Sequence, residues 1–110
     1  MTDKIVVLST CASAEEGQRV ARALVEKRLA ACVNLIGGVR SVYRWNDVIE
    51  DEEEVLLVIK TSRPLVTELQ VEIERLHSYE VPEFIALPIV EGSESYLAWM
   101  NRELAHKPSL

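Results

Sequence analysis

The sequence is poor in cations and has no long apolar run, and each shortage excludes a class of protein. Its 12 Lys and Arg are outnumbered by 18 Asp and Glu, which gives a net charge of −6. Nucleic-acid binding needs clustered cations that displace counterions, so nucleic acid is not expected as a partner. No segment approaches the ~18 consecutive apolar residues of a membrane-spanning helix, so no membrane partner is expected either. The apolar run 5–8 is too short for a secretion signal, which predicts a cytoplasmic protein.

Cysteine is also scarce. The two cysteines, Cys11 and Cys32, form no CxxC pair, which argues against a thioredoxin-like redox site and against a closed structural zinc site. We predict that both are free thiols. The sequence also lacks a nucleophile elbow, a phosphate-binding loop, a dinucleotide fingerprint and an HExxH helix. An enzyme is therefore the least favoured function.

What the sequence does contain is a regular alternation of strand and helix patterns over one domain, residues 1–110. The expected elements are a strand over 4–10, a helix from 13 to about 29, strands over 31–45 and 55–61, a helix over 64–76, a strand over 84–89 and a short C-terminal helix that includes 96–104. Residues 106–110 are expected to form a frayed tail. This order predicts an α+β fold of the ferredoxin-like type, βαββαβ, with an antiparallel sheet that carries two helices on one face.

Local signals support these elements. Ser13 with Glu16 three residues later is a capping box that starts the first helix. The pair Gly37–Gly38 predicts a bulge or bend in a long hairpin, and Pro88 predicts an edge position or a kink for the last strand. The spacing of apolar residues in the second helix places Glu72 on its exposed face.

The long hairpin and the second face of the sheet have no cover within one chain. Residues 55–59 are apolar on both sides of the strand, and the hairpin is too long for a compact monomer. Because an exposed apolar face favours association, we expect other copies of the chain to cover it.

A polar corner follows the second helix. His77, Tyr79, Glu80 and Glu83 lie within seven residues, next to the stiff residue Pro82. Imidazole with carboxylate is a ligand set for a borderline metal and also a possible acid–base pair. The alternative is structural, with His77 placed favourably against the dipole at a helix C-terminus.

Several motifs, in order and at consistent spacing, carry a resemblance to a known family. They are LVEKRLAACVN (24–34), SVYRW (41–45), EVLLVIKT (54–61), HSYEVPE (77–83) with ALPI (86–89), and YLAW (96–99). With these motifs nearly the whole chain resembles the CutA family of divalent-cation tolerance proteins. The resemblance implies a ferredoxin-like fold, a homotrimer similar in architecture to the PII signalling proteins, a cleft between subunits, and a role in tolerance of copper and other divalent metal ions.

The resemblance also implies metal ligands. The family's histidine at the exit of the second helix corresponds to His77, whereas its strand-one cysteine corresponds to Ser9, a poor ligand for copper. Cys11 lies two residues further along, on the same face of the strand. We therefore predict a divalent-metal site, with copper as the first candidate, made by His77, Glu83 and Cys11.

A second set of residues is predicted to line the cleft or the interface: Cys32, Tyr43, Trp45, Lys60 and Tyr79. Cys32 fits either a buried small hydrophobe or a ligand, and the two large aromatics fit interface anchors or cleft walls. Lys60 is expected to pair with Glu54 or Glu83, or else to bind an anionic ligand. These residues support an alternative function, a PII-like sensor or scaffold for a small anion or metabolite.

Overall fold

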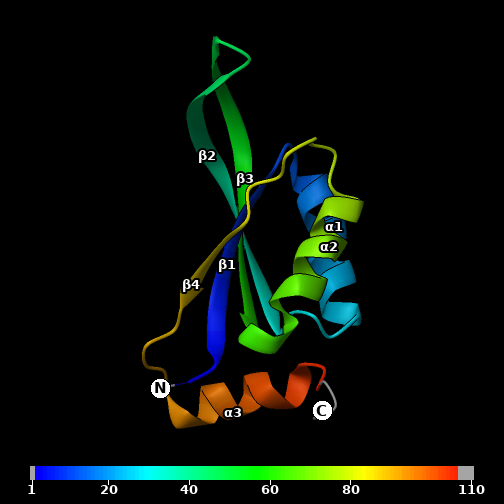
Figure 1. The fold of residues 1–110 in the computed structure, drawn as a ribbon, viewed down its shortest axis with the longest axis vertical. Coiled ribbons are helices and arrows are strands. Elements are labelled where there is room, and N and C mark those ends of the chain that lie inside the picture. The colour runs from blue at the N-terminus through cyan, green and yellow to red at the C-terminus, as the bar shows by residue number, and fades with distance from the viewer. Residues whose placement is uncertain (1, 107–110) are drawn as a thin grey trace.

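The computed structural model describes residues 2–106, which form one four-stranded antiparallel sheet and three α-helices (Figure 1). The elements are β1 (Lys4–Cys11), α1 (Ala14–Glu26), β2 (Cys32–Trp45), β3 (Val48–Ser62), a 3-10 turn (Arg63–Leu65), α2 (Val66–Leu76), β4 (Ile85–Pro88) and α3 (Glu94–Glu103). The strand order β2-β3-β1-β4 confirms the predicted α+β ferredoxin-like fold and the edge position of the last strand. Positions 107–110 of the predicted tail lie outside the described residues. None of the helices described is long and apolar enough to cross a membrane.

The first helix begins as the sequence predicts. The Oγ of Ser13 accepts a hydrogen bond from the N–H of Glu16 at 3.1 Å. The helix ends earlier than predicted, because Arg28 adopts a φ of 58° and the N–H groups of Leu29 and Ala30 turn back to the carbonyl of Leu24. This left-handed residue ends the helix in the manner of a C-terminal cap and sends the chain directly into β2.

The core lies between the sheet and the two helices α1 and α2, which cover the same face (Figure 1). Alternate residues of β1 and β3 point into this layer, and Val7, Leu57 and Ile59 are fully buried there. Leu24 of α1 and Leu69 of α2 pack onto them, also fully buried. Each such side chain contributes roughly 1.5–3 kcal/mol of hydrophobic free energy, so this layer fixes the ends of β1, α1 and α2 relative to one another.

The β2–β3 hairpin projects well beyond this core (Figure 1). Its register shifts between Ile36 and Val39, which confirms the bulge predicted at the glycine pair, and Gly38 has a φ of 73° there. Asn46 and Asp47 close the hairpin with φ values of 50° and 64°, the geometry of a type I′ turn, which follows the twist of the strands. The hairpin therefore ends in a tight turn, and residues 42–49 around this turn are exposed.

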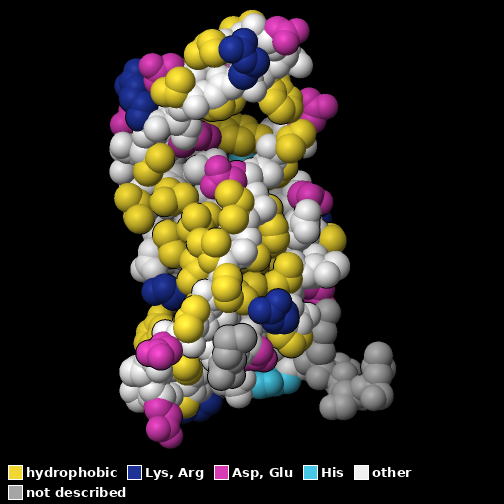
Figure 2. Space-filling view, turned by 60° about the vertical axis from the view of Figure 1, so that its left-hand side comes forward, with side chains coloured by type: hydrophobic (Ala, Val, Ile, Leu, Met, Phe, Trp, Pro, Cys, Tyr) yellow, Lys and Arg dark blue, Asp and Glu magenta, His cyan; other side chains and the backbone are white. Residues whose placement is uncertain are grey.

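The second face of the sheet has no helix over it. Strand register places Val6 opposite Leu87 and Leu8 opposite Ile85 on this face. Ile85 is 48% exposed, and Ile36 is 47% exposed. Figure 2, with this side of the molecule turned forward, shows apolar side chains gathered over its middle. We call this surface the open face; it is the uncovered apolar surface that the sequence predicts.

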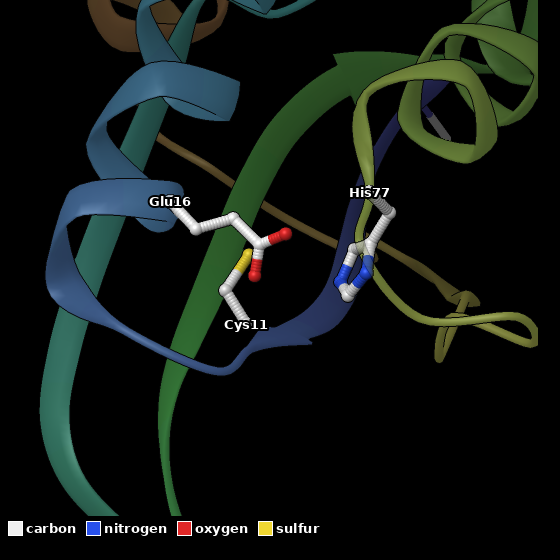
Figure 3. A group of neighbouring side chains, drawn as sticks. All are labelled: Cys11, Glu16 and His77. Atoms are coloured by element: carbon white, nitrogen blue, oxygen red, sulfur yellow. The ribbon is translucent and has the colours of Figure 1, made fainter.

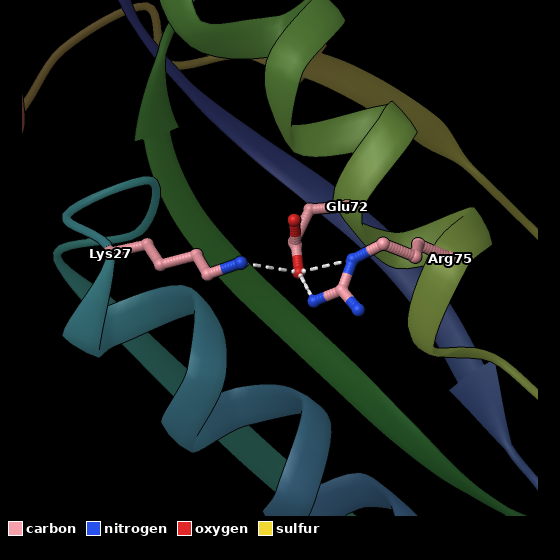
Figure 4. Close-up of polar contacts among 3 residues, drawn as sticks. All are labelled: Lys27, Glu72 and Arg75. Carbon is pink, nitrogen blue, oxygen red and sulfur yellow. Dashed lines mark hydrogen bonds and ion pairs between the residues drawn. The ribbon is translucent and has the colours of Figure 1, made fainter.

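The outward-facing position predicted for Glu72 is wrong. Only 9% of this residue is exposed, and its Oε1 accepts hydrogen bonds from Lys27 Nζ at 2.9 Å and Arg75 Nε at 3.1 Å (Figure 4). The spacing of apolar residues within α2 predicts an exposed Glu72 because it takes no account of other elements. In the structure Lys27, the residue just after α1, reaches across and covers the Glu72 carboxylate. The ion cluster joins the two helices on the side away from the sheet.

Candidate functional site

A thiol, a carboxylate and an imidazole meet where β1 ends, α1 begins and α2 ends. One ligand atom from each of Cys11, Glu16 and His77 lies within 4.8 Å of the others (Figure 3). We call these residues the Cys–Glu–His group. The sequence predicted Cys11 and His77 as ligands but assigned Glu16 only a capping role. The capping box was the available signal, because it directs the Glu16 carboxylate back toward the end of β1.

Both nitrogens of the His77 ring are engaged. Nε2 lies 2.6 Å from the carbonyl oxygen of Thr10, and Nδ1 accepts the N–H of Tyr79 at 2.9 Å. Because a carbonyl only accepts, Nε2 carries the proton, and because Nδ1 accepts, the ring is neutral. The partners thus assign the tautomer, and His77 holds the end of β1 against the segment after α2. A metal ion that binds either nitrogen must break one of these two bonds.

The Glu16 carboxylate is held by backbone donors. Its two oxygens accept the N–H of Ala12 at 3.1 Å and the N–H of Ser78 at 2.8 Å, and only 5% of the residue is exposed. Burial raises the pKa of Glu16, but the hydrogen bonds from Ser78 and Ala12 outweigh it, so the pKa lies below the ordinary value. None of the ion pairs within residues 2–106 involves this group. Glu16 therefore carries a negative charge with no paired cation from the described chain.

The Cys11 thiol is fully buried beside that charge. Burial, and to a lesser extent the nearby Glu16 carboxylate, raises the pKa of Cys11 from 9.0 to about 11. The positive charge of Arg19 opposes this rise. The thiol is therefore protonated at neutral pH and has little nucleophilic character. A metal ion that binds the sulfur must displace this proton.

Ser9 lies on the same face of β1, two residues before Cys11. It is fully buried, and its Oγ is the one buried side-chain polar atom without a hydrogen-bond partner in the described part of the chain. The resemblance places a metal-binding cysteine at this position. Here the position holds an unsatisfied hydroxyl in the core, at a cost of roughly 1–3 kcal/mol.

An open groove of about 730 Å³ lies beside the Cys–Glu–His group, between the hairpin and the segment after α2. Four residues predicted for the site or the cleft line it, namely Tyr43, Trp45, Tyr79 and Glu83. Glu54, predicted only as a partner for Lys60, also lines the groove, and it accepts the O–H of Tyr79 at 2.6 Å. Glu83 therefore belongs to the groove and not to the Cys–Glu–His group.

The remaining two cleft candidates lie elsewhere. Cys32 and Lys60 are partners in the β2–β3 register, and neither lines the groove. Lys60 Nζ contacts the hydroxyl of Tyr96 at 3.3 Å and lies 5.5 Å from the centre of its ring, so the predicted pairing with Glu54 or Glu83 is wrong. The reason is α3, which packs across the end of the sheet opposite the hairpin tip and brings Tyr96 to Lys60 (Figure 1). Both cysteines are free thiols, as predicted.

Known proteins share both the sequence and the fold. The sequence pattern of the family described as "CutA1 divalent ion tolerance protein" matches residues 5–103. The divalent-cation tolerance protein CutA of Thermus thermophilus is 46% identical over 96 residues, covering 87% of this chain and 93% of that protein. The chloroplastic CutA of Arabidopsis thaliana is 44% identical over 88% of this chain, which spans about half (53%) of that protein's length.

The fold comparison agrees. The solved structure described as the periplasmic divalent cation tolerance protein CutA from Archaeoglobus fulgidus superposes with a TM-score of 0.88 at 34% identity. The match covers 91% of this chain and 97% of that one. The family pattern, the sequence identity and the shared fold together show that the chain belongs to the CutA1 divalent ion tolerance protein family.

Proposed function

We propose that this protein binds a divalent cation at the Cys–Glu–His group and acts in metal-ion homeostasis, as a binding protein and not as an enzyme. The observation that carries the proposal is the convergence of Cys11, Glu16 and His77 within 4.8 Å. Ligands around one zinc-sized ion, bound at ~2.0–2.3 Å, lie about 3.3–3.8 Å apart, so a contraction of about 1 Å would complete the set.

The donor types favour a borderline metal. Thiolate and imidazole suit copper and zinc, and Cu(II) is the divalent ion of highest general affinity for such donors. Copper is therefore our first candidate. The Glu16 carboxylate supplies negative charge without a competing cation among the described residues.

The resting state of the group sets the conditions for binding. The ion must displace the Cys11 proton and one of the two hydrogen bonds of the His77 ring. Because the thiol proton is released, affinity is expected to rise with pH across the neutral range. Calorimetry in two buffers with different ionisation enthalpies measures the protons released per ion bound.

The test is a titration of Cu(II) and of Zn(II) into metal-free protein. We expect about one site per chain, weakened at least tenfold in His77→Ala and in the nearly isosteric Cys11→Ser. Glu16→Gln should weaken binding as well, and Glu83→Gln is its matched control, since it removes the same charge from the groove and not from the Cys–Glu–His group. Weak, unsaturable binding that is the same in all variants would mean that the acidic surface merely collects cations, and would contradict the proposal.

We also propose that the protein is a homotrimer. The support is the open face, the projecting hairpin and the short edge strand β4, all four of whose residues are exposed. Light scattering at micromolar concentration is expected to give three times the chain mass. Ile36→Glu on the open face should lower that mass, whereas Val71→Glu on the exposed side of α2 should not. A monomeric mass for the unmodified protein would contradict the proposal.

Cytoplasmic residence stays a prediction. The Arabidopsis relative is named as chloroplastic and the Archaeoglobus relative as periplasmic. Fractionation of the source cells, followed by immunodetection of the protein, tests the prediction.

A further inference from the structure

We propose that metal binding at the Cys–Glu–His group breaks the hydrogen bond between Tyr79 and Glu54, so that Tyr79 regulates the affinity of the group for its ion. This inference rests on the proposed function and deepens it, since it concerns the regulation of the same site. It is carried by the contacts of residues 77–79, which follow α2 and reach both the group and the hairpin.

Residues 77–79 hold the metal-free arrangement through two consecutive backbone donors. The Glu16 carboxylate accepts the N–H of Ser78 at 2.8 Å, and Nδ1 of His77 accepts the N–H of Tyr79 at 2.9 Å. Two of the three candidate ligands are therefore hydrogen-bonded to neighbouring N–H groups of one short segment. A contraction of the group around an ion competes with both of these bonds.

The Tyr79 N–H bond is lost whichever nitrogen of His77 binds the ion. If Nδ1 binds it, the ion takes the lone pair that now accepts the Tyr79 N–H. If Nε2 binds it, the Nε2 proton leaves the carbonyl of Thr10, and the neutral ring, which is the form that binds metals, carries its proton on Nδ1 instead. A protonated Nδ1 is a donor that faces a second donor, so the Tyr79 N–H must turn away.

The side chain of Tyr79 extends this displacement to the hairpin. Its ring centre lies 4.6 Å from that of His77, and its hydroxyl donates to Oε2 of Glu54 at 2.6 Å. Tyr79 is therefore held by its N–H, by its ring and by its hydroxyl, and the first two of these contacts are with His77. A shift of His77 toward Cys11 and Glu16 (Figure 3) consequently pulls on the third contact, the hydroxyl bond.

Glu54 is not free to follow this movement. It lies on β3, opposite Val39 in the strand register, and only 5% of the residue is exposed. A contraction of about 1 Å around the ion would stretch the hydroxyl bond to about 3.6 Å, beyond hydrogen-bond length. By linkage, the Tyr79 hydroxyl bond weakens metal binding by the same factor by which metal binding weakens that bond. Tyr79 is thus a positioning residue of the metal group and not a ligand.

Hydrogen exchange in the unmodified protein tests the backbone part of the proposal. Zn(II) is the probe, because it is diamagnetic and allows each N–H to be followed by NMR. We expect saturating Zn(II) to speed exchange of the Tyr79 N–H at least fivefold. The N–H of Ala31, which donates to the carbonyl of Lys60 at 2.8 Å, should change less than twofold. Slower or unchanged exchange at Tyr79 would overturn the proposal, because a site that only adds bonds does not release this N–H.

The variant Tyr79→Phe tests the hydroxyl part. It keeps the N–H and the ring and removes only the bond to Glu54, which the ion then no longer has to break. We expect Zn(II) to bind at least threefold more tightly by calorimetry. Tyr43→Phe is the matched control, because it removes a hydroxyl that contacts Glu52 at 3.4 Å, and it should change the affinity less than twofold. Unchanged or weaker binding in Tyr79→Phe, or equal tightening in Tyr43→Phe, would overturn the proposal.

Failure of this inference is distinguishable from failure of the proposed function. If Zn(II) binding is the same in His77→Ala as in the unmodified protein, both are wrong. If His77→Ala loses the site but the Tyr79 N–H and Tyr79→Phe show no effect, the metal site stands and its regulation by Tyr79 is wrong. If Tyr79→Phe fails to fold by circular dichroism, the exchange measurement on the unmodified protein decides.

Discussion

Two buried carboxylates hold α1 against neighbouring elements: Glu16 contacts the segment that follows α2, and Glu72 of α2 contacts Lys27 at the end of α1. Their negative charges are stabilised in different ways. Glu72 accepts from Lys27 and from both Nε and a terminal nitrogen of Arg75, so two cations converge on one oxygen (Figure 4). Hydrogen bonds from Arg75 and Lys27 hold the pKa of Glu72 below its ordinary value. Glu16 also has a lowered pKa, but its donors are neutral backbone N–H groups.

The difference separates a structural contact from a candidate binding group. At Glu72 the charge is cancelled locally, so that carboxylate has little attraction left for an added cation. At Glu16 the charge is stabilised by dipoles and stays uncancelled, next to a thiol and an imidazole that can also bind metal.

Replacement of each glutamate by glutamine should lower the free energy of unfolding, and more strongly at Glu16 than at Glu72. In Glu16→Gln, one of the two backbone N–H groups faces an NH₂ donor, so we expect a loss of about 2–3 kcal/mol in the free energy of unfolding. In Glu72→Gln, the remaining carbonyl oxygen still accepts from half-exposed cations, and we expect a loss of about 1 kcal/mol. Urea unfolding at one fixed protein concentration measures both. Equal losses would remove the contrast.

High pH should destabilise the protein through Cys11. The folded pKa of about 11 exceeds the ordinary value of 9.0. The contribution of this thiol is therefore complete below pH 9 and is lost as the pH rises toward 11, by on the order of 2 kcal/mol. Cys11→Ala should not show the stability loss that the thiol causes between pH 9 and pH 11, although this variant is less stable than the unmodified protein at lower pH. Parallel pH profiles for the two proteins between pH 8.5 and 11 would show that the thiol is not desolvated as described.

Ser9→Ala should stabilise the protein. It removes a buried hydroxyl without a partner in the described chain and leaves only a small void, so we expect a gain of about 1 kcal/mol. Thermal unfolding checks this gain. Thr61→Val is the comparison and should lower the stability, since the Thr61 hydroxyl donates a hydrogen bond to the carbonyl of Leu29 at 2.7 Å. A loss of stability in Ser9→Ala would mean that the hydroxyl is satisfied in solution.

A higher salt concentration should change the stability cost of Glu72→Gln but not that of Glu16→Gln, and this is the smallest of the expected effects. Raising NaCl from 0.1 M to 1 M shortens the screening length from about 10 Å to about 3 Å. The cost of Glu72→Gln should then shrink by about 0.5 kcal/mol, whereas the cost of Glu16→Gln should hold, because its backbone hydrogen bonds are short-ranged and buried. Repeating the urea series at both salt concentrations gives the comparison, and an equal response of the two variants would argue against it.

Local patterns in the sequence predicted the fold well. Period-two and helical spacings located the strands and helices, and the Ser13 cap and the glycine pair marked a helix start and a bulge that the structure confirms. Contacts between elements were harder to predict. Glu16 reaches Ser78, and Lys27 reaches Glu72, across separations that no local pattern encodes. Lys60 was misassigned because the packing of α3 across the sheet end decides its neighbour.

The Asn46–Asp47 turn also bears on the order in which the molecule folds. Its two left-handed residues bring β2 and β3 together through a loop of minimal length, so this hairpin can close with little loss of chain entropy. β4 pairs with β1 from the far end of the chain, through partners such as Ile5 and Pro88. Contacts that are distant in sequence form late. We therefore expect the hairpin to acquire protection from hydrogen exchange early in refolding, and the β1–β4 edge to be the last part of the sheet to close.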